Sequence, residues 1–206
     1  MQIREASVED AVEACQVVRR SIAELCHTDH QDDPIVLETW LSNNTSHNMR
    51  SWIADPDTYV IVATDGAAII GVGAIMSSGE ITLNYVSPDT RFRGVSKAIL
   101  NRLEARALEL GDDTCTLTST ETARRFYLSA GYVQFGPPEP GIGKGSSYRM
   151  VKKLFPSRTS GLNTKRYKFS GRRAVRATRV SVRHPLVGPE SCTRSDHYFS
   201  MVLGQR

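Results

Sequence analysis

The segment that decides the fold reads Val86-Ser87-Pro88-Asp89-Thr90-Arg91-Phe92-Arg93-Gly94-Val95-Ser96-Lys97. It joins a predicted strand to a predicted helix through a basic loop. Amides at a helix N-terminus lack helical partners and lie at the positive end of the helix dipole, so such a loop can hold a diphosphate. Gly94 allows close backbone approach, and Arg91, Arg93 and Lys97 add positive charge. Taken alone, the segment fits an ordinary strand-to-helix turn with solvated arginines equally well.

Strand and helix patterns alternate on both sides of this segment. Before it, a short strand at Ile3 precedes a helix capped at Ser7, a helix opened by Pro34 and a short helical piece that ends at residue 54. Two strands, 59–64 and 67–76, then flank the hairpin turn Asp65-Gly66. After the segment, the sequence predicts a helix that ends at Gly111, a strand at 114–118, a helix over 123–130 and a closing strand at about 146–153.

The charge of the chain changes sign near Leu154. The chain has 206 residues, and residues 1–154 hold 15 Lys and Arg against 20 Asp and Glu. Residues 155–206 hold 11 Lys and Arg against two acidic residues and show no sustained hydrophobic period. We therefore predict a folded domain over 1–154 and a basic C-terminal extension over 155–206, which we expect to be mostly disordered.

The composition is that of a globular protein, with 40% hydrophobic and 23% charged residues. We find neither an apolar run of the roughly 20 residues that a membrane span needs nor a secretory signal, and the four cysteines form no Cys-x-x-Cys pair. A cytoplasmic location without a membrane partner is the expectation.

Three motifs in order resemble those of the GNAT N-acetyltransferase superfamily. The pattern Arg91-x-x-Gly94-x-Ser96 is similar to its acyl-coenzyme-A loop, although the family usually carries Gly or Ala in place of Ser96. Residues 117–132 resemble its second motif, Ala-x-x-Phe-Tyr-x-x-x-Gly-Phe/Tyr, and residues 148–153 resemble its last strand. The resemblance covers about residues 1–154.

The resemblance implies a mixed α/β (α+β) fold. Its sheet would be strongly twisted and flanked by helices, with neighbouring parallel strands 80–86 and 114–119 that splay apart. Acetyl-coenzyme A is the implied co-substrate, and no metal is implied. Pantetheine is expected to enter the gap and pair with the first strand as an added strand would. The implied cofactor-binding residues are Leu83, Asn84, Tyr85 and Val86 on the strand, Arg91, Phe92, Arg93, Gly94, Val95, Ser96 and Lys97 in the loop, and Ser119, Thr120, Ala123 and Phe126 in the second motif.

The resemblance also implies direct attack of a neutral amine on the thioester, without a covalent enzyme intermediate. A strand amide in the stretch 83–86 is expected to bond the thioester carbonyl. Tyr127 is expected to protonate the leaving thiolate, because the family's Tyr at this place points at the coenzyme sulfur. The alternative is a Tyr that packs on the helix and anchors the cofactor. Phe126 fits the core better than the chemistry.

Glu80 is the expected base. It lies eleven residues before Arg91, where histone-acetylating members of the family carry their basic Glu. Strand alternation predicts that Glu80 shares a face with Thr82 and Asn84, opposite Leu83 and Tyr85. The alternatives are a solvated Glu beside the turn at 77–79, and a chain of waters that serves as base.

Other chemistry-bearing residues fit less well. His27, His30 and His47 lie in or beside the loops expected to wall the substrate side, and His27, Asp29 and His30 lack a fixed zinc spacing. Cys115 fits a buried strand residue. The glycines of 136–145 fit a flexible loop over the acceptor site.

We therefore expect an N-acetyltransferase that transfers the acetyl group of acetyl-coenzyme A to a primary amine of a small molecule or a protein. Acidic residues near the expected acceptor side favour a cationic substrate, namely Glu24, Asp29, Asp32, Asp33 and Glu38. One alternative is a non-catalytic acyl-coenzyme-A-binding or regulatory module, against which Glu80 and Tyr127 argue. The other is nucleic-acid binding through the basic extension, which is the less favoured reading. A homodimer stays open.

Overall fold

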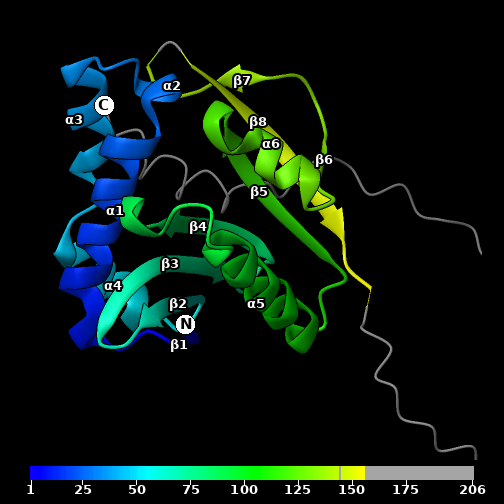
Figure 1. Cartoon of the computed structure of the whole chain (residues 1–206). Helices are drawn as coiled ribbons and strands as arrows, with labels where there is room; N and C mark the ends of the chain where they lie inside the picture. The colour runs from blue at the N-terminus through cyan, green and yellow to red at the C-terminus, as the bar shows by residue number, and fades with distance from the viewer. Residues whose placement is uncertain (144, 156–206) are drawn as a thin grey trace, which may run out of the picture.

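The computed structural model describes residues 1–143 and 145–155, which form a mixed sheet packed between helices (Figure 1). The N-terminal half contains β1 (Gln2–Glu5), the 3-10 turn η1 (Val8–Asp10), α1 (Ala11–Leu25), α2 (His27–His30), α3 (Pro34–Ser42), α4 (Ser46–Ala54), β2 (Thr58–Asp65) and β3 (Ala68–Met76). It is followed by β4 (Glu80–Val86), the 3-10 turn η2 (Pro88–Thr90), α5 (Val95–Leu110), β5 (Thr114–Thr120), α6 (Glu121–Ser129), β6 (Val133–Gln134), β7 (Glu139–Pro140) and β8 (Ser146–Lys153). The expected mixed α/β fold is confirmed.

The sheet is split between its two parallel strands. The described strands follow the order β1-β2-β3-β4-β5-β8-β6, with β7 paired to β8. Only β4 and β5 run parallel, and they pair only where Glu80 meets Thr116 and Ile81 meets Leu117. Beyond these pairs the two strands diverge (Figure 1). The expected splay is therefore present, and from Thr82 onward the edge of β4 toward β5 has no ladder partner among the described strands.

Strand β4 carries a β-bulge at the mouth of this split. On its other edge, Ala74 of β3 pairs with Leu83 and Ile75 pairs with Ile81, so Thr82 is an extra residue without a counterpart. A bulge bends the strand and interrupts the regular alternation of its side chains between the two faces. The faces of β4 before and after Thr82 therefore cannot be predicted by simple counting.

Two hydrophobic cores lie on the two sides of the sheet. One packs under α5 and α6 and includes Ile99, Leu103 and Tyr127. The other packs under α1, α3 and α4 and includes Ile22, Trp40 and Met49. Helix α5 lies close against β3 because Gly73 has no side chain, and a Cβ at this position would collide with Ile99.

Local capping explains where the N-terminal helices begin. Asp10 accepts a hydrogen bond from the Ser7 amide at 2.7 Å, as the predicted cap requires. Asp33 accepts from the Ile35 amide at 2.9 Å, and Pro34 occupies the first turn of α3. The glycine stop of α5 is also confirmed, since Gly111 has φ +93° at its C-terminal end.

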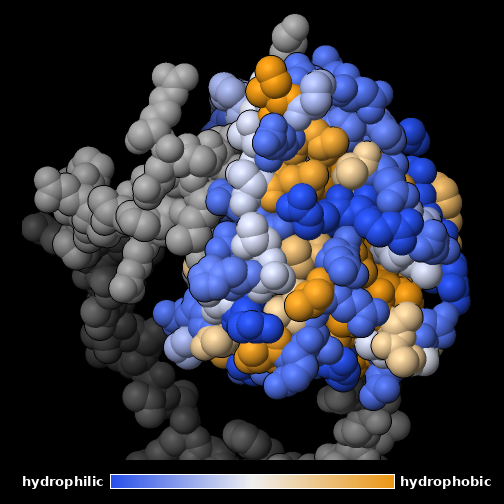
Figure 2. Space-filling model, turned by 90° about the vertical axis from the view of Figure 1, so that its left-hand side faces the viewer, coloured by the Kyte–Doolittle hydropathy of each residue, from blue (hydrophilic) through white to orange (hydrophobic). Residues whose placement is uncertain are grey.

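Figure 2 views the molecule from the side of α1 to α4, where hydrophobic residues are scattered among hydrophilic ones. No helix among the described residues is long and apolar enough to cross a membrane. Strand β8 ends at Lys153, and Leu154 is buried beside it. The expectations for the basic extension fall on residues that, apart from Phe155, lie outside the described part of the chain.

Candidate active site

The bulge decides which way Glu80 faces. Ile81 packs in the core under α5, whereas Leu83 and Tyr85 pack against the core under α1. Because neighbouring strand residues face opposite ways, Glu80 lies on the same side as Leu83 and Tyr85. The expectation that Glu80 shares a face with Thr82 and Asn84, opposite Leu83 and Tyr85, is therefore wrong. Thr82 shifts the phase of the strand by one residue.

Two cavities meet at the split between β4 and β5. The Glu80 cavity has a volume of about 130 Å³, and its lining includes Asp29, Trp40, Glu80, Ile81, Tyr85 and Ile142. The Tyr127 cavity has a volume of about 140 Å³, and its lining includes Cys26, Leu83, Asn84, Val86, Ala123 and Tyr127. Both cavities also touch the same residues of the split: Trp40, Ile81, Thr82, Tyr85, Thr118, Ser119 and Thr120. Molecules in the two cavities would therefore meet across the gap between the strands.

Tyr127 is held in the wall of its cavity by aromatic packing. Its side chain is buried, and its ring lies edge-on to Phe126 and Tyr132, with centroids 5.1 and 5.6 Å away. Burial raises the pKa of Tyr127 to about 12, and the side chain of Asn84 opposes part of this shift. The phenol therefore stays protonated at neutral pH and can donate a proton but cannot accept one as a phenolate.

Cys26 is a buried thiol in the lining of the Tyr127 cavity. Its pKa is raised to about 12, chiefly by burial and secondarily by the charge of Asp29. A thiolate released into the same cavity would meet the same low-dielectric surroundings and would be more basic than a thiolate in water.

Glu80 is half-buried at the start of β4. Burial raises the pKa of its carboxyl group above the ordinary value, and Arg149 of β8 opposes part of the increase. A carboxylate with a raised pKa is a stronger base, which suits proton abstraction near neutral pH. The geometry therefore places a basic carboxylate in one cavity and a protonated phenol in the other.

The basic loop ends at the N-terminus of α5. Gly94 precedes this helix with φ +79°, a conformation that favours glycine, and a Cβ there would meet nothing within 4 Å. The first hydrogen bond of α5 at this end runs from the Ala98 amide to the Gly94 carbonyl at 3.0 Å. The amides of residues 94–97 therefore precede the helical ladder. Val95 is buried, so only its backbone can reach a ligand, whereas Ser96 is partly exposed.

The side chains of the loop are already engaged in part. Phe92 is 90% exposed and has φ +62°, which is unusual for a residue with a side chain. The guanidinium of Arg91 lies 4.7 Å from the centre of the Phe92 ring. Arg93 forms an ion pair with Asp65 at 3.0 Å. All three predicted cations are exposed, and Lys97 lies on the first turn of α5.

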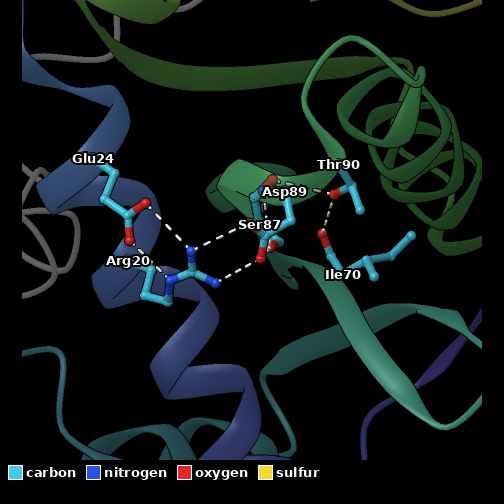
Figure 3. Close-up of polar contacts among 6 residues, drawn as sticks. All are labelled: Arg20, Glu24, Ile70, Ser87, Asp89 and Thr90. Atoms are coloured by element: carbon cyan, nitrogen blue, oxygen red, sulfur yellow. Dashed lines mark hydrogen bonds and ion pairs between the residues drawn. The ribbon is translucent and has the colours of Figure 1, made fainter.

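The root of the loop is tied to α1 and β3 (Figure 3). Arg20 of α1 forms ion pairs with Asp89 at 2.7 Å and with Glu24 at 2.8 Å. The Thr90 hydroxyl donates to the Ile70 carbonyl at 3.3 Å. Exposed ion pairs add little stability. We therefore interpret the ion pair between Arg20 and Asp89 as a contact that orients η2 relative to α1.

The second motif lies on the other side of the Tyr127 cavity. Ser119 is buried at the end of β5, and Thr120 caps α6 by accepting from the Ala123 amide at 3.4 Å. All three residues line the cavity. Phe126 is not among its described lining residues and packs half-buried against the core, so its contact with the cofactor stays a prediction.

Sequence reasoning missed Trp40, which lines both cavities, and the long-range contact that Asp29 makes. Trp40 is buried in α3 and hydrogen-bonds the side chain of Tyr85, whose pKa is raised by its own burial. Asp29 accepts a hydrogen bond from the Glu121 amide of α6 at 2.9 Å, across 92 residues of sequence. No local pattern predicts this contact, because it depends on how α2 and α6 meet in three dimensions.

Asp29 does not share a cluster with His27 and His30. Ligand atoms of His27, His30 and Asp32 lie within 4.8 Å of one another, whereas Asp29 turns toward α6. His27 Nδ1 lies 2.7 Å from Asp32 Oδ1, and His30 Nδ1 accepts from the Asp32 amide at 3.1 Å. These nitrogens are thus engaged within the chain. His47 lies in the first turn of α4, and Cys115 is buried as expected.

Comparison with solved structures gives the same fold. The chain is similar to a GCN5-related N-acetyltransferase of Rhodopseudomonas palustris, with 22% identity, a TM-score of 0.66 and coverage of 74% of this chain and 95% of that one. It is also similar to the PaiA N-acetyltransferase of Thermoplasma acidophilum in complex with coenzyme A, with 20% identity, a TM-score of 0.61 and coverage of 74% and 98%. YncA of Salmonella typhimurium, solved with its cofactor acetyl-CoA, has 16% identity, a TM-score of 0.59 and coverage of 79% and 98%.

The family model described as an acetyltransferase (GNAT) domain matches residues 23–150. No curated protein matches the chain significantly. The family match includes the basic loop, and it includes β4, β5, α6 and most of β8, which contribute lining residues to the two cavities. The chain therefore belongs to the GNAT acetyltransferase family.

Proposed function

We propose that this protein is an N-acetyltransferase that binds acetyl-coenzyme A and acetylates a primary amine. The observation that carries the proposal is the split in the sheet, where β4 loses its partner after Ile81 between two cavities. The relatives solved with coenzyme A and acetyl-CoA share this fold and support the choice of co-substrate.

The residues around the split fit coenzyme A in both shape and chemistry. The edge of β4 from Leu83 to Val86 offers backbone groups to which pantetheine can add as a strand. The amides of residues 94–97 and the exposed Lys97 suit a diphosphate, and the open space over Gly94 leaves room for it. Ser119, Thr120 and Ala123 would face the same ligand from the opposite wall.

Acetyl-coenzyme A supplies the thioester whose carbonyl carbon the amine attacks. An amide on the free edge of β4 would bond the acyl oxygen and stabilise the charge that develops there. Glu80 would take the proton of the attacking amine, directly or through a water. Tyr127 would give its proton to the sulfur as the carbon–sulfur bond breaks. The products are the amide and the free thiol of coenzyme A.

Opposite orientations of the two groups support this division of labour. Glu80 faces the side of α1 to α3, whereas Tyr127 belongs to the core under α5 and α6. The amine would therefore enter through the Glu80 cavity, and the coenzyme would lie in the Tyr127 cavity. Their meeting point is the gap beside Thr82.

The test is a panel of primary amines incubated with acetyl-coenzyme A, in which release of free thiol is measured. We expect at least one amine to release thiol in proportion to acetylated product identified by mass spectrometry. Calorimetric titration with coenzyme A provides a separate measurement of binding. Binding without transfer to any amine would favour a non-catalytic acyl-coenzyme-A-binding module.

A further inference from the structure

Asp29 carries a carboxylate that is only half satisfied. Its side chain is 3% exposed, and Oδ1 accepts from the amides of Glu121 at 2.9 Å and Thr122 at 3.5 Å. The other oxygen, Oδ2, is buried and has no hydrogen-bond partner in the described part of the chain. A buried carboxylate oxygen without a donor lowers the stability of the fold. A ligand that donates a hydrogen bond to Oδ2 would remove this cost.

The Glu80 cavity lies directly against this residue. Asp29 and Glu80 are both among its lining residues, and none of the described lining residues is Lys, Arg or His. Two carboxylates in a lining with no described basic side chain make the cavity attractive to cations, although the charge of Arg149 acts on Glu80 from outside this lining. Its volume of about 130 Å³ suits a small ligand or the end of a longer one.

The remaining wall suits an alkyl chain. Ile81 and Ile142 provide aliphatic surface, and the aromatic rings of Trp40 and Tyr85 line the same space. Aromatic faces attract ammonium groups and also pack against methylene groups. The lining therefore offers carboxylates to an ammonium group and apolar surface to its alkyl chain.

We propose that Asp29 determines substrate specificity by binding the second, non-reacting ammonium group of a short aliphatic diamine. This inference rests on the proposed function, in which Glu80 faces the reacting amine. Asp29 would then neutralise the positive charge of the second ammonium group. Amino acids and acidic peptides are disfavoured because their own carboxylates would face Asp29 and Glu80.

The test compares 1,4-diaminobutane with n-butylamine, which has the same carbon chain and one amine. In the wild-type protein we expect kcat/KM for the diamine to exceed that for the monoamine by about tenfold or more, the usual worth of a charge-assisted hydrogen bond. Asp29→Asn keeps an oxygen for the Glu121 amide but removes the charge. It should bring this ratio close to one, because kcat/KM for the diamine falls by more than kcat/KM for n-butylamine.

Asp32→Asn is the matched control. It removes one negative charge from the same segment, but the Asp32 side chain is 75% exposed and is not among the described residues of the cavity. The diamine preference should persist in this variant. Equal loss on both amines in Asp29→Asn would instead identify Asp29 as a cap of α6 and would overturn the inference without touching the proposed function.

Two further outcomes are also decisive. If Asp29→Asn fails to fold, the wild-type ratio decides alone, and equal kcat/KM for the two amines overturns the inference. If neither amine is acetylated, these acceptors are wrong for the proposed function. Calorimetry on the coenzyme-A complex then tests the site itself: tighter binding of 1,4-diaminobutane than of n-butylamine supports it, and no difference overturns it.

Discussion

Replacement of Tyr127 by Phe separates the chemistry of the phenol from the packing of its ring. The ring contacts Phe126 and Tyr132 edge-on, and these contacts do not involve the hydroxyl. Deleting the hydroxyl should therefore cost about 1 kcal/mol of stability or less, the net value of an ordinary hydrogen bond. Affinity for coenzyme A should remain nearly intact, because the shape of the Tyr127 cavity is kept.

The rate of transfer should fall much more. A general acid contributes about 10²–10⁴-fold, or roughly 3–5 kcal/mol of activation free energy. Tyr127 can supply this effect because burial raises its pKa to about 12, so the phenol is still protonated when the thiolate leaves. Single-turnover thiol release with saturating acetyl-coenzyme A isolates this step from product release.

Tyr132→Phe is the control for this experiment. Tyr132 is also buried and packs against the Tyr127 ring. It is not among the described lining residues of either cavity. Loss of the Tyr132 hydroxyl should leave the rate of acetyl transfer unchanged. A drop of less than about threefold in Tyr127→Phe would refute the acid role and leave Tyr127 as an anchor, with a water as the proton donor.

Two further substitutions test the rest of the site, and one truncation tests the domain boundary. For Glu80→Gln we expect a rate loss that shrinks at high pH, where the amine deprotonates unaided, whereas a loss independent of pH would indicate a structural role. Burial raises the pKa of Glu80, so the folded state holds this proton more tightly and loses stability as pH rises through the Glu80 pKa; Glu80→Gln should therefore melt no lower than wild type at neutral pH. Gly94→Trp should abolish coenzyme A binding in calorimetry. The domain should stay folded at a cost of about 1–2 kcal/mol from the positive φ, because a side chain at this position meets open space, and retained affinity would contradict the loop assignment. Truncation after Leu154 should preserve melting temperature and coenzyme A binding, because Leu154 is buried and donates its amide to Asp113 at 2.6 Å; an unfolded product would show that the domain boundary is wrong.

The elements with a clear period or cap could be predicted from the sequence. The helix that ends at Gly111, the hairpin around Gly66 and the cap at Ser7 all depend on local interactions that a single segment specifies. Helix α2 and strands β6 and β7 are only four, two and two residues long, too short to show a period. They form because longer elements hold them in place.

The bulge at Thr82 shows a different limit. The pattern from Glu80 to Tyr85 reads as regular alternation, and the only sign of irregularity is the pairing with β3. Register with a neighbouring strand is a property of two segments, so one segment cannot reveal it. The identity of Glu80 as a site residue could thus be proposed from the sequence, whereas the face on which it lies could not.

The same irregularity explains how one strand can serve two cavities. In a regular strand, Glu80 would share a face with Asn84, which lies near Tyr127, and base and acid would compete for one space. The extra residue at Thr82 turns Glu80 toward Asp29 and Trp40 while Asn84 still faces α5, where its side chain donates to Ser96 at 3.4 Å. In the proposed reaction the amine gives up its proton in the Glu80 cavity and the sulfur receives one in the Tyr127 cavity. The two groups therefore act from different cavities, and the pKa of about 12 keeps the Tyr127 phenol protonated until the thiolate leaves.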